Sequence, residues 1–333
     1  MFRLRRLTLF IVLLASACSQ KPSVDSISEP SSPAPAISIT LTPLSTFTPH
    51  PTFSLANTAL PATPVSQPTL GKTPQVPFGL TFDQINPIFY GKIFLGATSG
   101  DIWLYPREVY PLLGNAQVYD FYDQNFQPFP TTVVVPEPRT EGAHQCDFLD
   151  FKFVDPGIGD VSPVLGVKPG QSVTFRPVQT IAQDSGLYEQ YLQEWLVLQG
   201  VSSPELGVVK VLRVDLEGDA VDEVILVATN IEDSMGGLHE AGAGKYSVVL
   251  MRKVIGAQVY TVPLVVEIYY ATDSKMEYPI IYDVDHIYDL NGDGNLEIIL
   301  SGRWWEGGGL FVHEVHELNA VRVLDLICGW DPR

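Results

Sequence analysis

Short runs of β-forming residues, separated by clusters of Gly, Pro, Asp and Asn, make up most of the chain after Phe78. Representative runs are TTVVV, VVKVLRV, DEVILVAT, YSVVLMRKV and LEIILSG. Runs of this kind with turn residues between them are typical of antiparallel sheets. The sequence therefore predicts a mainly β, antiparallel protein with a partial-propeller or sandwich-like architecture.

One segment has helical instead of strand periodicity. Its apolar residues are Leu187, Tyr188, Tyr191, Leu192, Trp195 and Leu196. Asp184 and Ser185 are capping candidates before this segment, and Gly200 is a stop signal after it. We expect one clear α-helix here, which joins a first β region, 79–180, to a helix-plus-β region, 181–333, that contains two acidic Gly loops.

Residues 1–17 have the layout of a signal peptide. Three arginines precede an apolar run from Leu7 to Ala17, which is about half the ~20 residues that a helix needs to cross a bilayer. The run ends in the motif ASAC at Cys18, which resembles the lipobox of bacterial lipoproteins. The resemblance implies that Cys18 is acylated and becomes the first residue of the mature chain. An ordinary secretory signal with an incidental cysteine is the alternative.

Residues 18–78 form the predicted linker between this anchor and the folded part. Ser, Thr and Pro are abundant in the linker, and large apolar side chains are few. Such a chain buries too little surface to offset its conformational entropy, so we expect a disordered, extended tether. An O-glycosylated stalk or a Pro-rich docking site is the alternative.

The protein is strongly acidic, with 20 Lys and Arg against 38 Asp and Glu and a net charge of −18. This balance argues against nucleic acid as a partner, because phosphate binding needs a clustered basic surface. Acidic surfaces suit cations instead. With the predicted signal and lipid, we expect an extracytoplasmic protein of the bacterial cell envelope, attached to the membrane through its lipid anchor.

The stretch DLNGDGNLE, which begins at Asp289, carries oxygen-bearing side chains at alternate positions. A glycine at its sixth position, Gly294, favours a left-handed turn that brings these oxygens together. Hard oxygen donors in this number suit calcium. The predicted ligands are the side chains of Asp289, Asn291, Asp293 and Glu297 and the carbonyl of Asn295. A metal-free turn between strands is the alternative.

This loop is not an EF-hand, because its twelfth position is Leu300 and an apolar strand follows. It resembles the calcium loops of FG-GAP and VCBS-type β repeats, which are known from integrin-type propellers. A second copy, DLEGDAVDE, begins 74 residues earlier at Asp215. Its corresponding ligands are Asp215, Glu217, Asp219, the carbonyl of Val221 and Glu223. Ala220 replaces the glycine there and costs about 1 kcal/mol if it is left-handed, so this copy is the weaker metal candidate.

From about Tyr188 to Cys328 the chain looks like uncharacterised bacterial envelope proteins that carry the paired D-L-x-G-D element and a WEG-like segment, here Trp305-Glu306-Gly307. These relatives imply no assigned activity. Because neighbouring residues of a strand face opposite sides, we expect one of Trp304 and Trp305 in the core and the other at a rim.

Two further motifs do not indicate a site. His313 and His316 are three residues apart in a β context, whereas a gluzincin needs two histidines four apart on a helix. We expect them on opposite faces of a solvated strand. The segment AGKY, which ends at Tyr246, lacks the Ser or Thr that follows the lysine of a Walker loop, so we expect no phosphate site.

Cys146 and Cys328 are the only thiols left after lipidation of Cys18. In an oxidising envelope such a pair favours a disulfide, which would tie the first β region to the last. In a reducing envelope both would be small buried side chains.

No set of catalytic residues stands out in this sequence. We therefore expect a non-enzymatic, calcium-binding module at the cell surface that binds a glycan, a wall polymer or another protein. One alternative is a hydrolase of extracellular polymers that uses carboxylates such as Glu306, and another is a spacer domain. A cleft with convergent carboxylates would favour the enzyme, and an aromatic patch would favour binding.

Replacing Cys18 with Ser tests the predicted anchor. The variant should leave the membrane and partition into the aqueous phase of a detergent phase separation, because the apolar run is too short to span a bilayer and only the acyl chains would hold the protein. Partitioning into the detergent phase by the variant would contradict lipidation at Cys18.

Overall fold

Strands make up most of the described chain and pair antiparallel, which confirms the predicted fold class. The computed structural model describes residues 79–114, 116–135, 146–154, 164–181, 186–232, 241–270 and 278–329. The predicted signal peptide, Cys18 and the linker lie outside the described residues, as do Asp184 and Ser185. No helix in the described ranges is long and apolar enough to span a membrane.

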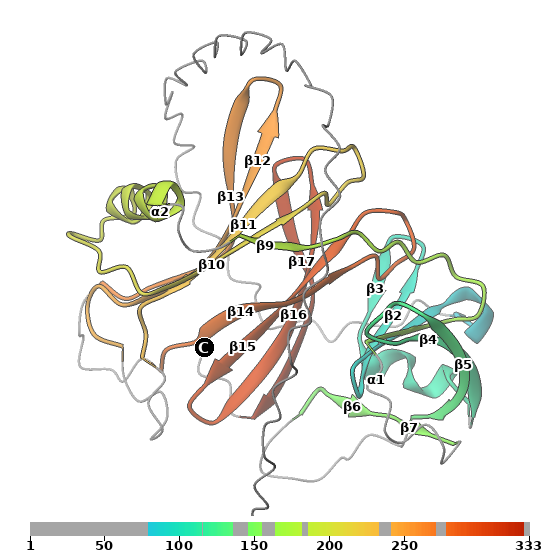
Figure 1. Cartoon of the computed structure of the whole chain (residues 1–333). Helices are drawn as coiled ribbons and strands as arrows, with labels where there is room; N and C mark the ends of the chain where they lie inside the picture. Colours follow the sequence, from blue (N-terminus) through green and yellow to red (C-terminus); the bar gives the residue numbers. More distant parts are fainter. Residues whose placement is uncertain are drawn as a thin grey trace, which may run out of the picture. The chain divides into compact units, whose positions relative to one another are not determined.

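The first region forms sheet A, which curves into a half-barrel (Figure 1). Its strands are β1 (Asn86–Tyr90), β2 (Ile93–Ser99), β3 (Ile102–Leu104), β4 (Gln117–Tyr122), β5 (Pro128–Val134), β6 (Leu149–Asp150), β7 (Lys152–Phe153) and β8 (Leu165–Val167). The order is β3-β2-β1-β8-β4-β5-β7, with β6 paired to β2. Aromatic rings fill its core around Phe89, together with the short helix α1 (Pro106–Val109).

The remaining strands form two further sheets. Sheet C consists of β9 (Gln179–Ile181), β10 (Val208–Val214), β11 (Glu223–Thr229), β12 (Tyr246–Ile255) and β13 (Gln258–Ile268), in the order β13-β12-β11-β10-β9. Sheet B consists of β14 (Ile281–Tyr288), β15 (Glu297–Trp304), β16 (Gly307–His316) and β17 (Asn319–Gly329), in chain order. Strands β10 to β13 and β14 to β17 are thus two four-stranded meanders, and an acidic loop joins the first two strands of each.

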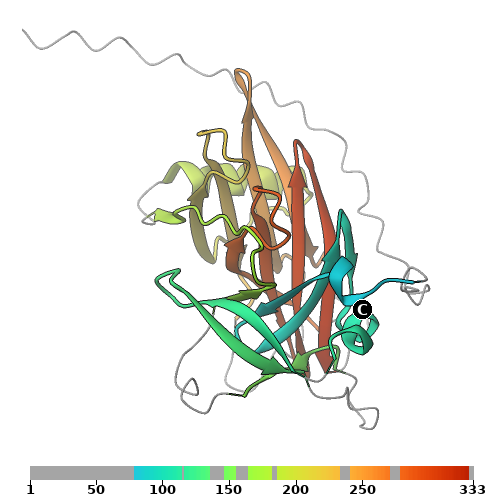
Figure 2. The ribbon, with the colours of Figure 1, turned by 90° about the vertical axis from the view of Figure 1, so that its right-hand side faces the viewer.

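Sheet B, drawn in red in Figure 2, is the middle layer between the other two sheets. Ile298 and Leu300 of β15 pack in the same core as Ile225 and other residues of sheet C. Ile299 lies between them in sequence and packs on the opposite face with residues of sheet A such as Leu95. Because both faces of β15 are buried, its sequence is continuously apolar at these positions.

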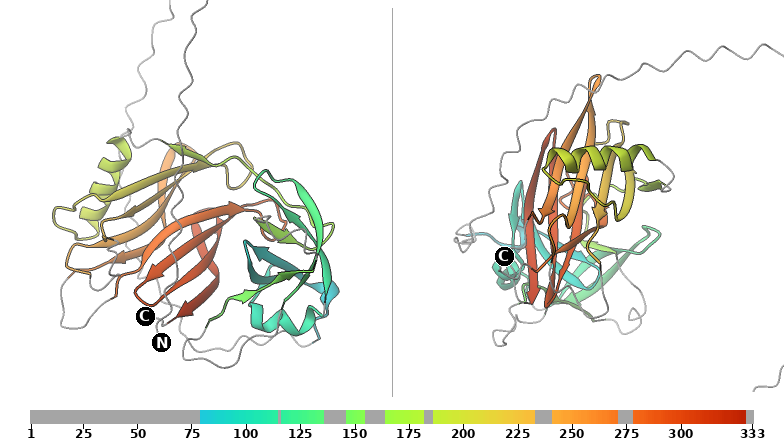
Figure 3. Two further views of the ribbon diagram at one scale, coloured as in Figure 1. Left: turned by 60° about the horizontal axis from the view of Figure 1, so that its bottom comes forward. Right: turned by 90° about the vertical axis from the view of Figure 1, so that its left-hand side faces the viewer.

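The helix α2 (Gly186–Leu198) covers the outer face of sheet C (Figure 3, right). Leu192 and Leu196 are fully buried there, and the helix is the one that the periodicity predicts. It ends as expected near Gly200, whose amide donates to the carbonyl of Val197 at 2.9 Å. The predicted region boundary at residue 180 falls inside β9, which belongs to sheet C.

Two predictions about single side chains have clear outcomes. Trp304 is buried and Trp305 is 36% exposed, so one tryptophan is in the core and the other at the surface, as expected. His316 is exposed, but the prediction of a solvated strand is wrong for His313, which is 2% exposed in the core. Burial lowers the pKa of His313 to about 3, so its ring is neutral at physiological pH.

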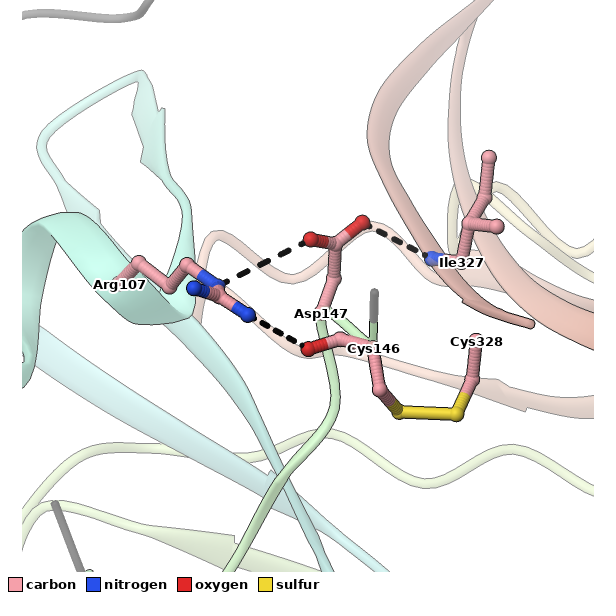
Figure 4. Close-up of a disulfide and its surroundings, with 5 residues drawn as sticks. All are labelled: Arg107, Cys146, Asp147, Ile327 and Cys328. Carbon is pink, nitrogen blue, oxygen red and sulfur yellow. Dashed lines mark hydrogen bonds and ion pairs between the residues drawn. A yellow bond between two sulfur atoms is a disulfide. The ribbon is translucent and has the colours of Figure 1, made fainter. Parts of the chain in front are cut away.

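Cys146 and Cys328 are joined as a disulfide across 182 residues, between the segment before β6 and the end of β17 (Figure 4). Polar contacts surround it. Ile327 donates its amide to the Asp147 carboxylate at 3.2 Å and accepts from the Asp147 amide at 2.7 Å. Arg107 donates to the carbonyl of Cys146 at 2.8 Å. The disulfide and these bonds therefore connect sheet A to sheet B.

Peptide maps of the exported protein should differ by one linkage, Cys146 to Cys328, between non-reducing and reducing conditions. The double variant Cys146→Ser, Cys328→Ser should lose up to about 4–5 kcal/mol in denaturant unfolding, because the long loop is no longer closed in the unfolded chain. Alkylation of both thiols before lysis would contradict the linkage in the exported protein.

Candidate acidic-loop site

The two acidic loops lie side by side. The first loop runs from Asp215 to Glu223 and the second from Asp289 to Glu297. The backbone amide of Leu296 in the second loop donates to the carbonyl of Leu216 in the first at 2.9 Å. Residues that are far apart in the sequence are thus brought together by the packing of sheet C on sheet B.

Arg176, in the connection between β8 and β9, bridges the two loops. Its guanidinium donates to the carbonyls of Asp215 at 3.2 Å, Leu216 at 2.9 Å and Gly294 at 2.5 Å. A guanidinium suits this position because its planar fork can donate to several acceptors at once. The bridge also places a positive charge between two strongly acidic segments.

The first aspartate of each loop organises the turn in the same way. Asp215 accepts from the amides of Gly218 at 2.6 Å and Ala220 at 3.0 Å. Asp289 accepts from the corresponding amides of Gly292 at 2.7 Å and Gly294 at 3.2 Å. The sequence repeat is therefore also a repeat of hydrogen bonds.

The glutamate that ends each loop reaches back to its beginning. Glu223 accepts from the amide of Leu216 at 2.9 Å, and Glu297 accepts from the amide of Leu290 at 2.6 Å. Both side chains are almost fully buried, with 2% and 1% of the residue exposed. Each therefore satisfies a buried amide that would otherwise be costly.

The sixth position of each loop is left-handed. Gly294 has φ +92°, and Ala220 has φ +66°. For the alanine, this left-handed conformation costs about 1 kcal/mol, as expected from the sequence. The first loop keeps the turn geometry in spite of this strain.

The two loops differ in the charge that faces their terminal glutamate. In sheet C, Val224 pairs with Arg252, so the adjacent residues Glu223 and Lys253 lie opposite each other. Lys253 is 5% exposed and forms ion pairs with Glu217 and, at 3.7 Å, with Glu223. The first loop is thus paired with a lysine from the neighbouring strand β12.

In sheet B the position that corresponds to Lys253 carries a carboxylate. Ile298 pairs with His313, so the adjacent residues Glu297 and Glu314 lie opposite each other. The Glu314 carboxylate accepts from the indole of Trp103 at 2.6 Å and from the amide of Asn291 at 3.4 Å. A negative charge in the second repeat therefore replaces the positive charge of the first.

The second loop gathers four carboxylates: Asp289, Asp293, Glu297 and Glu314. Within the described ranges, no Lys or Arg forms an ion pair with any of them, and His316 lies 3.5 Å from Glu314. Burial, and after it the nearby charges of the other three carboxylates, raises the pKa of Glu297 well above its usual range, although the Leu290 amide opposes this shift. Burial also raises the pKa of Asp289. Ionised carboxylates at this loop therefore have no directly paired Lys or Arg within the described ranges, since the Arg176 guanidinium donates to backbone carbonyls of the loops.

In the part of the chain that the structure describes, no three His, Cys, Asp or Glu side chains are arranged as a formed metal cage. Oxygens of Asp289, Asn291, Asp293 and Glu297 accept from backbone amides of the loop. The second loop has the donor chemistry that calcium prefers, but its side chains must turn to coordinate the ion. The first loop fits poorly, because Lys253 already forms ion pairs with Glu217 and Glu223.

Three residues of this arrangement were not identified from the sequence: Arg176, Lys253 and Glu314. None of them lies in the loop motif. Lys253 and Glu314 lie opposite the terminal glutamates on neighbouring strands, so they can be identified only once the strand pairing is known. Arg176 lies in the connection between β8 and β9, which the loop motif does not indicate.

No protein-family model matches this chain, and no similar curated protein or solved structure was found by comparison.

Replacing Arg176 with Ala tests the pairing of the loops. Three carbonyls lose a charged donor, so the free energy of unfolding should fall by about 2 kcal/mol in denaturant titrations, allowing for partial exposure to solvent. Arg176→Lys should recover only part of this loss, because a lysine lacks the fork. Unchanged stability in both variants would show that the loop pairing does not depend on this bridge.

Proposed function

We propose that this chain is a lipid-anchored, extracytoplasmic binding module whose second acidic loop takes up one calcium ion. The proposal joins the lipobox at Cys18, the predicted tether and the charge distribution around Asp289 to Glu297. The proposed binding surface is stabilised by calcium and lies at the end of the tether. We propose no catalytic centre.

The calcium proposal rests on one difference between the two repeats. Glu314 in the second repeat occupies the position of Lys253 in the first. Two loops with the same hydrogen bonds differ in the sign of the charge opposite their terminal glutamate. A buried carboxylate is costly unless it is paired, and the first loop pairs its glutamate internally. The second loop must obtain its cation from solvent or protonate a carboxylate, and calcium is the oxygen-preferring cation available outside the cell.

The residues that would hold the ion are Asp289, Asn291, Asp293 and Glu297 through their side chains and Asn295 through its carbonyl. Glu314 would add its charge from outside the loop. The bound ion would supply positive charge at the meeting point of the three sheets and would hold the loop in one conformation. We propose no metal for the first loop, since Lys253 takes its place.

The hydrolase alternative relies on carboxylates near the Gly-rich connection, such as Glu306. Glu306 is exposed and does not line the cavity of about 680 Å³ beside β10, β11 and β14 or the cavity of about 360 Å³ near Gly200 and Tyr270. The larger cavity is lined by the acidic residues Glu205, Glu232 and Asp283, and Lys210 pairs with Asp283 at 2.9 Å. We keep binding as the proposal, because the charge difference between the two acidic loops bears on a bound ion and not on a reaction.

The decisive experiment compares the thermal unfolding of the purified protein in EDTA and in calcium. An extracellular loop of this type should bind with a dissociation constant of about 10⁻⁴–10⁻³ M. Calcium at 100 times that value should stabilise the protein by about 2.7 kcal/mol, because the ion binds only the folded loop. Magnesium should do much less, since its octahedral demands fit such a loop poorly.

The duplicated loop supplies matched controls. Asp293→Ala should abolish the calcium response, whereas Asp219→Ala should leave it intact. Glu314→Lys copies the arrangement at Lys253, so it should raise the melting temperature in EDTA and remove the calcium response. An unchanged melting temperature of the wild type in calcium, with no heat of binding in calorimetry, would refute the proposal.

A further inference from the structure

The hairpin of β12 and β13 extends beyond its neighbours in sheet C (Figure 1). The pairing of β12 with β11 ends at Arg252, and β13 lies at the edge of the sheet. Among the described strands, the residues from Val254 to Val259 therefore pair only across the hairpin. We call these six residues the hairpin tip.

The hairpin tip is apolar although it is exposed. Val254, Ile255 and Val259 expose 44%, 40% and 50% of their surface. The segment from Val254 to Val266 contains no charged residue, whereas charged residues make up 17% of the chain. Exposed turns are usually built from polar residues, Gly and Pro, so three aliphatic side chains at this place keep apolar surface in water without a need of the turn.

The equivalent hairpin of the second repeat shows that the fold does not require an apolar tip. The β16–β17 hairpin has a two-residue turn like that of the β12–β13 hairpin. The first residue of each turn has a positive φ, +63° at Gly256 and +53° at Glu317. The second tip is nevertheless polar, because His316, Glu317 and Asn319 are its exposed residues. The same turn is thus polar in one repeat and apolar in the other.

The two cations below the hairpin tip are held by partners. Lys253 is 5% exposed and forms ion pairs with Glu217 and Glu223. The guanidinium of Arg252 lies over the ring of Tyr191, 3.8 Å from its centroid. The tip itself carries no charge, so it can enter an apolar phase without desolvating a charged side chain.

These features fit a lipid surface better than a protein partner. A specific protein interface buries about 1,000 Å² or more and is anchored by aromatic or Arg side chains in matching pockets. The hairpin tip instead offers aliphatic side chains on a narrow, convex turn, and lipid tails need no matching shape. Three residues on each strand span about 10 Å, and elements that lie in a membrane interface bury their apolar side chains by about 5–10 Å.

The charge around the hairpin tip also selects the lipid head group. Glu217 and Asp219 belong to the first acidic loop, which contacts Lys253 directly below the tip. These carboxylates and the net charge of −18 repel an anionic membrane surface. A bilayer of zwitterionic phospholipid without net charge therefore fits the tip best.

We propose that the hairpin tip inserts into the interface of a phospholipid membrane without net charge and orients the folded part of the chain on it. Insertion of three aliphatic side chains is weak and reversible, so it orients a chain that is already held close to the membrane. This orienting role rests on the lipid anchor proposed above, whereas the affinity of the tip for lipid depends on its own residues. Without the anchor the chain dissociates on dilution, which agrees with the loss expected for Cys18→Ser.

The test uses the full-length chain with Cys18→Ser, which carries no acyl chain, and floats it with an excess of phosphatidylcholine vesicles. A fraction of the protein should float with them, and less should float with vesicles that contain phosphatidylglycerol. Val259→Asp and Ile255→Asp should each reduce the floating fraction about tenfold, because an ionised carboxylate is costly in an apolar phase. Val118→Asp is the matched control, since Val118 is 51% exposed on β4 of sheet A, and it should have no effect.

A second measurement locates the hairpin tip in the anchored protein. The wild-type lipoprotein is reconstituted into phosphatidylcholine vesicles, with a polarity-sensitive fluorophore attached at Ile255→Cys or at Val118→Cys. Cys146 and Cys328 are joined, so the disulfide leaves the introduced thiol for labelling. Emission from the first site should shift to shorter wavelength and be quenched by lipids with nitroxide-labelled tails, whereas emission from the second should not change.

Each outcome decides the proposal. No flotation of the Cys18→Ser chain overturns it, and so does an equal loss in Val118→Asp and Val259→Asp. A dimer that sediments without vesicles and is dissociated by Val259→Asp also overturns it, because the tip would then bind a second copy of the chain. Flotation that depends on the tip, in a wild-type protein that carries no acyl chain by mass spectrometry, supports the tip and overturns the lipid anchor.

Discussion

Two buried glutamates, Glu223 and Glu297, close the loops on which the arrangement of the sheets depends. Each accepts a backbone amide from the start of its own loop, so a strand end and a loop start are held at a fixed distance. The amide of Leu296, next to Glu297, donates to the carbonyl of Leu216 in the first loop. This hydrogen bond pairs the two loops where sheet C packs on sheet B. A buried acceptor at this point is required, because an unsatisfied buried amide costs about 1–3 kcal/mol.

The same glutamates create a charge that each repeat must balance. Lys253 does so in the first repeat, in a buried ion pair with Glu217 and Glu223. The second repeat carries Glu314 in the corresponding place and so increases the negative charge. The two copies thus keep the same backbone hydrogen bonds but differ in the charge next to the terminal glutamate. Under the calcium proposal, the absence of this internal partner is what would let the second loop bind a cation.

Much of the fold could be predicted from the sequence because it depends on local patterns. The strands, the helix from Gly186 to Leu198 and the two loops follow from periodicity and turn residues, and the left-handed Ala220 follows from its place in the motif. The burial of His313 and the partners of the loops could not be predicted. They depend on which strands pair, on bulges such as that between Val312 and His313, and on the packing of distant segments.

Arg176 illustrates why the environment of a site is harder to predict than its motif. The segment from Thr174 to Arg176 has no regular structure of its own, yet consecutive residues contact the Asp289 carboxylate, the ring of Tyr288 and both acidic loops. Thr174 directly precedes Phe175, so a displacement of Asp289 that carries the Thr174 amide with it would act on the phenylalanine through the backbone. A cation that orders the loop would thereby order a surface ring that it does not touch, and the coupling needs no motion of the sheets.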